Sequence, residues 1–421
     1  MGALLARIKR LYQSGAFHIV GSNAINKMVT FISSIIVVRI LTKGEYGLFT
    51  YAWNIYSIIL LFNGMGIENG VLQLGSEKSG DAAYAGKLSN YAARFGLKFD
   101  ILLTVAILTI GLFFPMEIEG AGVLLCMLCL LPMPKLISAI NGVYLRTQKR
   151  NKEMSGVSVL TTMVVLIITN TCAWLFREKG LILGYYIAYL FSITVTTWYC
   201  KLRYLRGKAI LQPDERKALF AISFISMCNN GLSQLMYLLD VFVLGIVVPD
   251  EAVLASYKVA TTIPSALTFI PIAVMVYLYP YFAQNRENGK WCMRKYGQVL
   301  GVMGAFNAAV SAVLFFFAPF VVRTFFGADY MDAVPIFRLL SVSYFFSGTF
   351  RILSGNLLVT QRKLKFNLFI AVFSGIANAV ANYFFIQWWG PMGAALATVC
   401  VVIFTSILNT VYLIYTFRKA K

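Results

Sequence analysis

Three positively charged residues, Lys27, Lys135 and Arg351, lie in the middle of long apolar runs of the chain. About 20 apolar residues cross a bilayer, so each of these cations would lie near mid-depth, too far from either surface to escape easily. A charge there requires a water-filled cavity or a counter-charge. Arg binds phosphate oxygens as a fork and Lys as a point charge, so fixed cations in a cavity would suit a phosphate-bearing ligand.

Polar side chains accompany these cations at helical spacing. Asn23, the adjacent pair Asn26 and Lys27, and Thr30 follow one another at spacings of three and four, which predicts one polar face of a helix. Arg351 shares such a face with Tyr344, and Asp240 follows Asn230 along another. The predicted cavity-lining polar set is therefore Asn23, Asn26, Thr30, Asn230, Asp240 and Tyr344.

Other cations of the apolar runs lie nearer the outer surface. Lys258 and Arg39 fall in the outer third of their runs and Arg338 close to the surface, so all three can also serve as anchors whose long stems reach outward. The predicted binders of an anionic group are Lys27, Arg351, Lys135 and Lys258. The competing interpretation is an ion pair of Lys27 with Glu68 or Asp240, which would make Lys27 structural.

Composition places these residues in a membrane protein. Hydrophobic residues make up 59% of the 421-residue chain and the mean hydropathy is +0.73, too high for a soluble domain. We predict an all-α polytopic protein with twelve apolar spans. They are residues 17–40, 46–74, 95–114, 121–144, 155–176, 181–200, 219–247, 253–281, 297–322, 334–358, 366–389 and 393–417.

The basic residues predict the orientation of these spans. Of the 37 Lys and Arg residues, 27 fall in the termini and connectors on one side and only four in the connectors on the other. The positive-inside rule then puts both termini in the cytoplasm. The net charge of +20 therefore mostly reflects the orientation of the chain in the membrane, and no nucleic acid partner is expected.

The two halves of the chain repeat each other. A shift of 206 pairs Asn23 with Asn229, Glu45 with Glu251 and Tyr51 with Tyr257. A shift of 213 pairs the basic turn after Thr147-Gln148 with the one after Thr360-Gln361, and Gly180 with Gly393. With six spans each, residues 1–210 and 211–421 are predicted to form two lobes related by a parallel pseudo-twofold repeat, with the substrate path between them.

Cofactor and energy signals are sparse. Cys126 and Cys129 form a C-x-x-C inside an apolar helix without acidic or His neighbours, so packing is the better interpretation and neither metal nor cofactor is expected. Residues 80–87 lack the P-loop spacing and its Ser/Thr, so energy would come from an ion gradient, from product consumption or from a partner. Asp240 could bind a proton or Na⁺ or balance a nearby cation, and Glu68 is a second candidate for ion coupling.

Several motifs resemble one transporter family. The run from Arg39-Ile-Leu through Glu45-Tyr-Gly-Leu-Phe49, and then Gly64-x-Gly-Ile-Glu-Asn-Gly70, are similar to the opening of Wzx-type polysaccharide-unit flippases of the multidrug/oligosaccharidyl-lipid/polysaccharide (MOP) exporter superfamily. Asp240, Tyr257 and the closing run 389–398 fit the same pattern. The resemblance implies alternating access for a polyprenyl-diphosphate-linked oligosaccharide in a prokaryotic cytoplasmic membrane. It also implies a role in O-antigen, capsule or exopolysaccharide assembly, with a polysaccharide polymerase and a chain-length regulator as partners.

Two other functions remain open. A drug or cation antiporter of the same superfamily would favour acidic and aromatic groups in its cavity, whereas cations dominate here. A membrane enzyme that polymerises or ligates glycans would need a catalytic outer loop, and the outer loops of this chain are short. We therefore expect a transporter rather than an enzyme.

Overall fold

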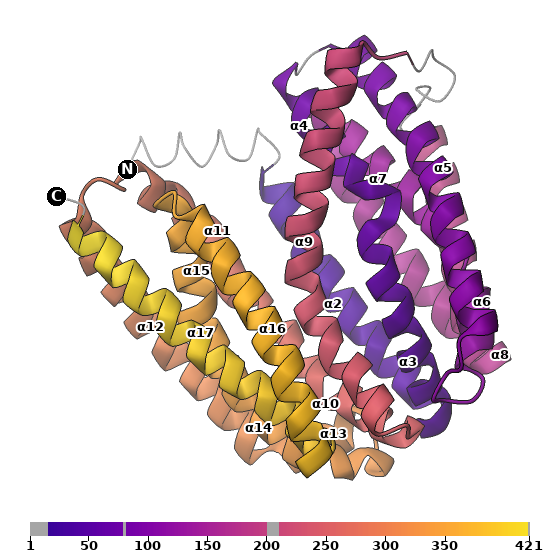
Figure 1. Cartoon of the computed structure of the whole chain (residues 1–421), viewed down its shortest axis with the longest axis vertical. Coiled ribbons are helices and arrows are strands. Elements are labelled where there is room, and N and C mark those ends of the chain that lie inside the picture. The colour runs from indigo at the N-terminus through magenta and orange to yellow at the C-terminus, as the bar shows by residue number, and fades with distance from the viewer. Residues whose placement is uncertain (1–15, 79–80, 200–209, 420–421) are drawn as a thin grey trace. The chain divides into compact units, whose positions relative to one another are not determined.

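The computed structural model describes residues 16–78, 81–199 and 210–419 and divides into two compact units, Met1–Gly231 and Leu232–Lys421. Every regular element of these residues is helical (Figure 1). The predicted boundary was at 210, and the observed one lies inside helix α9 (Pro213–Val247). Leu219 and Ser223 in the first half of α9 lie against Gly70, which is why that half belongs to unit 1.

Unit 1 contains the first six spans. In chain order its elements are α2 (Ala16–Ile40), α3 (Lys43–Ile59), η1 (Leu60–Gly66), α4 (Ile67–Glu77), α5 (Ala82–Phe113), α6 (Ala121–Met127), α7 (Pro132–Thr147) and α8 (Asn151–Tyr199). Helix α2 packs mainly on α8, and α7 packs on α4, α5 and α8. The core between them is aliphatic and includes Ile67, Leu88, Leu136 and Ile140, all with no exposed surface.

Unit 2 continues from the second half of α9 in the same pattern. Its further elements are α10 (Glu251–Leu267), α11 (Phe269–Gln284), α12 (Gly289–Phe316), α13 (Ala318–Phe325), η3 (Ala328–Ala333), α14 (Val334–Phe346), η4 (Ser347–Arg351), α15 (Ile352–Thr360), α16 (Leu364–Trp389) and α17 (Pro391–Lys419). Helices α16 and α17 pack on each other, and α14 packs on α10, α12 and α17. Phe282, Cys292, Leu357 and Phe417 belong to its core.

The helices account for the twelve predicted spans. Within the described ranges, nine helices are long and apolar enough to cross a membrane, and ten if the bent pair α6 and α7 counts as one span. Helix α8 contains two spans, because its backbone leaves helical geometry at Phe176 and Arg177. Helix α9, with its shorter apolar part Leu238–Val247, supplies the twelfth. The all-α, multi-pass fold class is confirmed.

The second span of unit 1 is broken at its centre. Gly64, Met65 and Gly66 are consecutive residues in the left-handed region, with φ of 51°, 54° and 65°. Glycine adopts this conformation without penalty, but Met65 does so only under tertiary constraint. The constraint comes from Asp100 of α5, whose Oδ1 accepts a hydrogen bond from the backbone N–H of Gly64 at 2.8 Å. Asp100 is fully buried and thereby fixes the break.

The matched basic turns have the same backbone in both units. Two residues after the end of α7, Lys149 has φ 57°, and two residues after the end of α15, Arg362 has φ 60°. The next residue closes each turn, Arg150 N–H donating to Leu145 O and Lys363 N–H to Leu358 O, both at 2.9 Å. This is a Schellman-type helix end, and the Thr147 and Thr360 hydroxyls donate to equivalent carbonyls within it. The repeat inferred from the sequence is confirmed at this turn.

Candidate functional site

Helix α2 has three distinct faces in unit 1. Its packed face contacts α8, where Asn26 Nδ2 donates to Ser158 Oγ at 2.7 Å and Asn170 Nδ2 donates to Ser33 Oγ at 3.1 Å. Its second face is apolar and exposed, with Ile25, Met28 and Ile32 at 43%, 58% and 47% exposure. Its third face is polar and exposed, and consists of Asn23, Lys27 and Thr30.

The two exposed faces of α2 require different surroundings. At about 100° per residue, the polar face points to nearly the opposite side of the helix from the apolar one. Lys27 is about 16 Å from the start of α2 and about 20 Å from its end. Hydrocarbon suits Ile25, Met28 and Ile32, but a Lys at that depth needs water or an anion. Asn26 was predicted on the same polar face, and the structure places it in the contact with α8 instead.

Glu68 and Lys135 form a second charged group in unit 1. Both side chains are half-buried, and they act on each other electrostatically. Glu68 begins α4 directly after the left-handed break, and Lys135 lies in the first turn of α7. Within the described part of unit 1, Lys27 makes no ion pair with Glu68, so the predicted competitor for Lys27 is not formed there. Lys135 has a carboxylate neighbour instead.

Arg351 lies at the end of a π-helical turn in unit 2. The turn, η4, interrupts the span between α14 and α15 and contains Ser347, Gly348, Thr349, Phe350 and Arg351. Such turns insert an extra residue into a helix and redirect the side chains beside it, and they are frequent at functional sites. Arg351 itself is half-buried. The sequence predicted Arg351 on a regular helical face and missed the π turn.

Asn307 of α12 holds the π turn from the side. Its Nδ2 donates to Thr349 Oγ1 at 3.2 Å, and its Oδ1 accepts a hydrogen bond from Tyr344 at 2.9 Å. Gly348 leaves the room for this approach, since a Cβ there would lie 3.0 Å from Asn307 Nδ2. Asn307 and Tyr344 are 0% and 2% exposed. Tyr344 was predicted to line a cavity, and the structure buries it as a support of the turn that carries Arg351.

Lys258 lies on the open face of α10. It is exposed, whereas the residues on either side of it, Tyr257 and Val259, are buried. Thr261 and Thr262 both donate hydrogen bonds to the carbonyl of Lys258 at 2.8 Å, so their hydroxyls lie one turn along the same face. Lys27 in unit 1 and Lys258 in unit 2 are therefore the two predicted binders with exposed side chains.

Asp240 is the centre of a polar cluster inside unit 2. Its carboxylate accepts hydrogen bonds from Asn382 Nδ2 at 2.7 Å, Thr398 Oγ1 at 2.5 Å and the Tyr257 hydroxyl at 3.0 Å. The same Asn382 amide also donates to Asn378 Oδ1 at 3.0 Å. Asp240 is only 8% exposed, so the structure buries a residue that was predicted to line a cavity.

The donors around Asp240 are all neutral. Among the described residues of unit 2, none forms an ion pair with Asp240, and hydrogen bonds alone offset the cost of its burial. Asn378, Asn382 and Thr398 were not predicted as site residues. A signal existed for two of them, because Asn378 and Asn382 are one turn apart in the apolar span 366–389.

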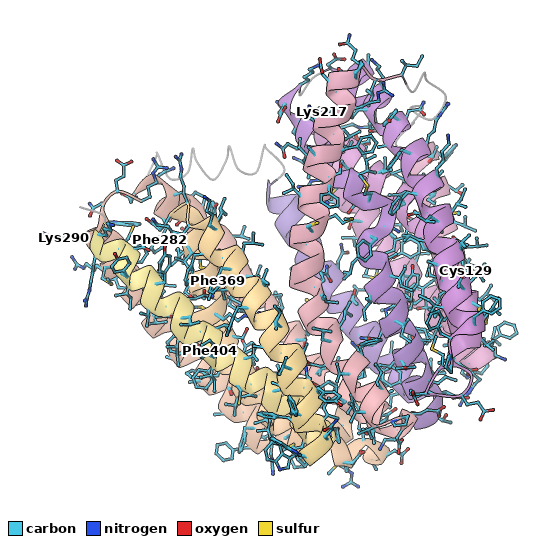
Figure 2. All side chains as sticks on the ribbon, in the orientation of Figure 1. Cys129, Lys217, Phe282, Lys290, Phe369 and Phe404 are labelled. Carbon is cyan, nitrogen blue, oxygen red and sulfur yellow. The ribbon has the colours of Figure 1, made fainter. Side chains whose placement is uncertain are left out.

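The remaining predicted residues lie apart from these clusters. Asn230 in α9 and Arg39 at the end of α2 are exposed. Arg338 of α14 donates to the carbonyl of Phe315 at 3.2 Å and lies over the Phe315 ring, which is how an anchoring Arg behaves. The free cysteines include Cys126 and Cys129 (Cys129 is labelled in Figure 2), and the described residues contain no group of acidic, His and Cys side chains that could hold a metal.

Comparison with solved structures identifies the fold. A multidrug resistance MATE family transporter of the MOP superfamily in an inward-facing conformation matches with a TM-score of 0.80 at 14% identity, covering 96% of this chain and 99% of that one. The lipid II flippase MurJ matches with a TM-score of 0.73 at 15% identity, covering 94% and 86%. A MOP superfamily transporter from Pyrococcus furiosus, described as having a binding pocket of reversed polarity, matches with a TM-score of 0.63 at 13% identity, covering 97% and 96%.

Sequence comparison identifies the family. No curated protein sequence matches the chain. The polysaccharide biosynthesis protein family, in contrast, matches residues 36–335, which is more than half of the chain. The chain therefore belongs to the polysaccharide biosynthesis protein family and has the fold of the MOP superfamily transporters.

Proposed function

We propose that the protein translocates a polyprenyl-diphosphate-linked oligosaccharide across a prokaryotic cytoplasmic membrane by alternating access, for assembly of a surface polysaccharide. The observation that carries this proposal is the exposed polar face of α2, with Lys27 at mid-depth and an exposed apolar face on the other side. Membership of the polysaccharide biosynthesis family supports the substrate class, and the likeness to a protein named as a lipid II flippase supports the transport of a lipid-linked unit.

The physical reason for cations on such a path is the diphosphate. Moving a multiply charged anion through hydrocarbon is prohibitive unless fixed positive charges replace its hydration. Lys27 and Lys258 are exposed residues with an ammonium group, one in each unit. Arg351 adds a planar guanidinium that binds phosphate oxygens in pairs. In this proposal each of the three residues offers a positive charge to the diphosphate along its path. Lys135 contributes less, because the carboxylate of Glu68 partly offsets its charge.

Substituting Lys27 tests the role of the polar face. We expect Lys27→Gln to reduce translocation of a polyprenyl-diphosphate-linked oligosaccharide in proteoliposomes by about tenfold or more, because a charge-assisted contact contributes about 1.5–3 kcal/mol. Met28→Gln, on the apolar face of α2 nearly opposite to the polar face, is the matched control for helix integrity. Wild-type translocation by a folded Lys27→Gln protein would remove the basis of the proposal.

Reversing the charge at Arg351 tests the contribution of unit 2. We expect Arg351→Glu to abolish export while the protein remains inserted at normal levels, since a carboxylate would repel the diphosphate. Arg338→Glu, in the same span but bound to the Phe315 carbonyl, is the matched control and should retain most activity. Normal export by Arg351→Glu would show that Arg351 does not contact the substrate.

The Asp240 cluster is the proposed coupling site. A buried carboxylate surrounded by neutral oxygens and amides is stabilised by uptake of a proton or Na⁺. Tyr257, whose hydroxyl donates to Asp240, directly precedes Lys258 in α10. We expect Asp240→Asn to make translocation insensitive to an imposed ion gradient. Separate Na⁺ and pH gradients across the vesicles identify the ion, and a variant that responds to both as wild type does would exclude Asp240.

A drug or cation antiporter is the alternative that the same reagents test. Lys27→Ala and Arg351→Ala should weaken binding of a lipid diphosphate and leave binding of an organic cation unchanged. The reverse result would favour the antiporter. In this proposal both termini lie in the cytoplasm, as the basic connectors predict. A polysaccharide polymerase and a chain-length regulator would act on the exported unit on the opposite side of the membrane.

A further inference from the structure

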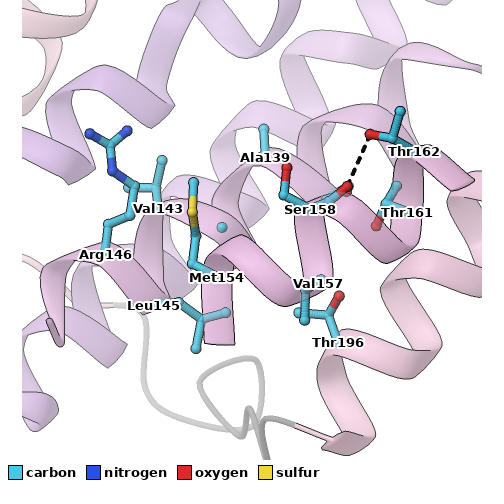
Figure 3. Close-up of a pocket in the computed structure, with 12 residues that line it drawn as sticks. Ala139, Val143, Leu145, Arg146, Met154, Val157, Ser158, Thr161, Thr162 and Thr196 are labelled. Carbon is cyan, nitrogen blue, oxygen red and sulfur yellow. Dashed lines mark hydrogen bonds between the residues drawn. The ribbon is translucent and has the colours of Figure 1, made fainter. Parts of the chain in front are cut away.

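A pocket separate from the cation faces lies at the basic end of unit 1. It has a volume of about 250 Å³ and opens between α7 and the two arms of α8. Figure 3 shows Arg146 at one end of it and Ser158 with Thr162 at the other. This is the end of unit 1 where α7 stops, α8 begins and α9 begins, near Lys217 (Figure 2).

Small residues keep this pocket open. Gly142 lines it one turn before Arg146, and a Cβ built on Gly142 would meet no atom within 4 Å. Ala139 lines the next turn. Elsewhere along the same wall are Val143, Leu145, Met154 and Val157, so an aliphatic surface separates the polar ends. A larger side chain at position 142 would occupy the space without straining the backbone.

The polar lining includes Arg146 at one end and Ser158 with Thr162 at the other, and Ser138, Thr161 and Thr196 line the pocket as well. Arg146 is exposed and presents its guanidinium at the mouth. At the inner end Ser158 Oγ accepts from Asn26 Nδ2, so its own hydrogen remains available to a ligand. Thr162 donates instead to the carbonyl of Ser158. The pocket therefore offers a cation at the surface and a hydroxyl about 10 Å deeper along α8, counted from Asn151.

The charge around the mouth excludes a positively charged ligand. No acidic residue is among the described residues that line the pocket. The nearby carboxylate, Glu153, is held by Arg150 through a hydrogen bond of 2.8 Å. Lys149, in the connector after α7, and Lys152, in the first turn of α8, are exposed. An ammonium headgroup would find only repulsion here, whereas a phosphate would be attracted.

Size and polarity together indicate the ligand. A volume of 250 Å³ corresponds to about eight water molecules, which admits a phosphoglycerol group but not an oligosaccharide. A glycerophospholipid has a phosphate near the surface and ester carbonyls deeper, matching Arg146 and the Ser158 hydroxyl in that order. A polyprenyl diphosphate has no ester carbonyl for the inner hydroxyl.

We propose that this pocket binds the headgroup of an anionic glycerophospholipid, with the phosphate on Arg146 and an ester oxygen on Ser158. The site is independent of the transport proposal, because it uses none of the residues assigned to the substrate or the ion. Its occupancy would tie α7 to both arms of α8 at one membrane surface, as basic pockets between membrane helices do for anionic lipids.

Lipid binding to the purified, delipidated full chain tests the proposal. We expect dioleoylphosphatidylglycerol to raise the unfolding temperature and to be retained in native mass spectra, and dioleoylphosphatidylcholine to do so about tenfold more weakly. Arg146→Gln should weaken the phosphatidylglycerol effect by roughly tenfold, the usual value of one charge-assisted contact. Gly142→Leu should abolish it by filling the pocket.

Matched variants control for general effects. Gly156→Leu also adds a side chain where a Cβ meets no atom within 4 Å, but Gly156 does not line the pocket. Lys365→Gln removes one charge from the first turn of α16, at the position in unit 2 that corresponds to Lys152. Both should bind phosphatidylglycerol as wild type does.

Several outcomes would overturn the proposal. One is a folded Gly142→Leu or Arg146→Gln protein that binds phosphatidylglycerol normally. A second is inorganic phosphate alone reproducing the stabilisation, which would indicate a site for free anions. A third is a polyprenyl diphosphate displacing phosphatidylglycerol at lower concentration, which would assign the pocket to the substrate path. None of these depends on measured transport, so a failure here is distinct from a failure of the transport proposal.

Discussion

Two helix hairpins, one in each unit, have the same backbone but different residues at the turn. In unit 1 the arms of α8 meet at Arg177, with φ 56° and ψ −138°, and in unit 2 the arms α16 and α17 meet at Gly390, with φ 55° and ψ −138°. Glycine adopts this conformation readily, whereas a residue with a Cβ is strained in it. In unit 1, contacts must therefore stabilise a backbone conformation that a glycine adopts without strain in unit 2.

The contacts that hold Arg177 are visible. Its guanidinium binds both carboxylate oxygens of Glu45, at 3.0 and 2.9 Å, and donates to the carbonyl of Ile40 at 2.9 Å. Glu45 also closes the capping box with Thr42 at the start of α3. The strained residue thus connects the hairpin of α8 to the junction between α2 and α3, and so to the helix that carries Lys27.

The comparison extends from backbone to chemistry. The basic turns, the hairpins, and Gly180 with Gly393 recur in both units. The proposed functional charges do not recur. With the shift of 206, Asp240 corresponds to Ser34 and Lys258 to Ala52, and with the shift of 213, Lys135 corresponds to Gly348. The repeat preserves the scaffold, and each unit has acquired its own charged groups.

We expect the largest loss of stability from substitutions of Gly180 and Gly393, the glycines that occupy matched positions in the two hairpins. A Cβ on Gly180 would overlap the carbonyl oxygen of Cys172, and one on Gly393 that of Phe385. Gly180→Ala and Gly393→Ala should each force the hairpin arms apart and cost about 3 kcal/mol or more, measured as lost yield of folded protein and a lower unfolding temperature. Gly297→Ala, where a Cβ meets nothing within 4 Å, is the control. If one of the two substitutions leaves the yield and the unfolding temperature unchanged, the two hairpins are not equivalent.

The π turn of unit 2 should be the next most sensitive feature. Asn307→Leu removes two buried hydrogen bonds and leaves the Tyr344 and Thr349 hydroxyls without this partner, at about 1–3 kcal/mol each. We expect a lower unfolding temperature together with a loss of transport that approaches that of Arg351→Ala. Asn356→Ala, which removes a single bond within α15, should leave transport unchanged. If Asn307→Leu lowers the unfolding temperature but leaves transport unchanged, Asn307 has only a packing role.

The hairpin residues themselves should respond in opposite directions. Gly390→Ala places a Cβ in a strained conformation and should cost about 1–3 kcal/mol. Arg177→Gly relieves strain of the same size and loses an exposed ion pair that contributes about 0–1 kcal/mol, so its unfolding temperature should be equal or higher. Thermal unfolding of both variants in the same detergent decides this. A destabilised Arg177→Gly protein would mean that the Glu45 contact outweighs the strain.

Much of the fold could be predicted because the bilayer imposes it. Hydrophobic runs must be helical to satisfy their backbone groups, so span number follows from hydropathy and the repeat from matched turns. The site was less predictable. Mid-depth cations could be found as isolated charges in apolar runs, but hydropathy could not show that Tyr344 is buried, that Asn26 faces α8, or that Asn378, Asn382 and Thr398 surround Asp240.

The sequence by itself determined the class of protein, its spans, its repeat and which residues are too polar for lipid, because each of these depends on local composition and spacing. Only the tertiary structure decided which of those polar residues remain open and which are enclosed. Lys27 and Asn26 are neighbours in one stripe of α2, yet one is exposed and the other bonds Ser158. That difference depends on where α8 packs, and packing partners distant in sequence leave no mark in local periodicity.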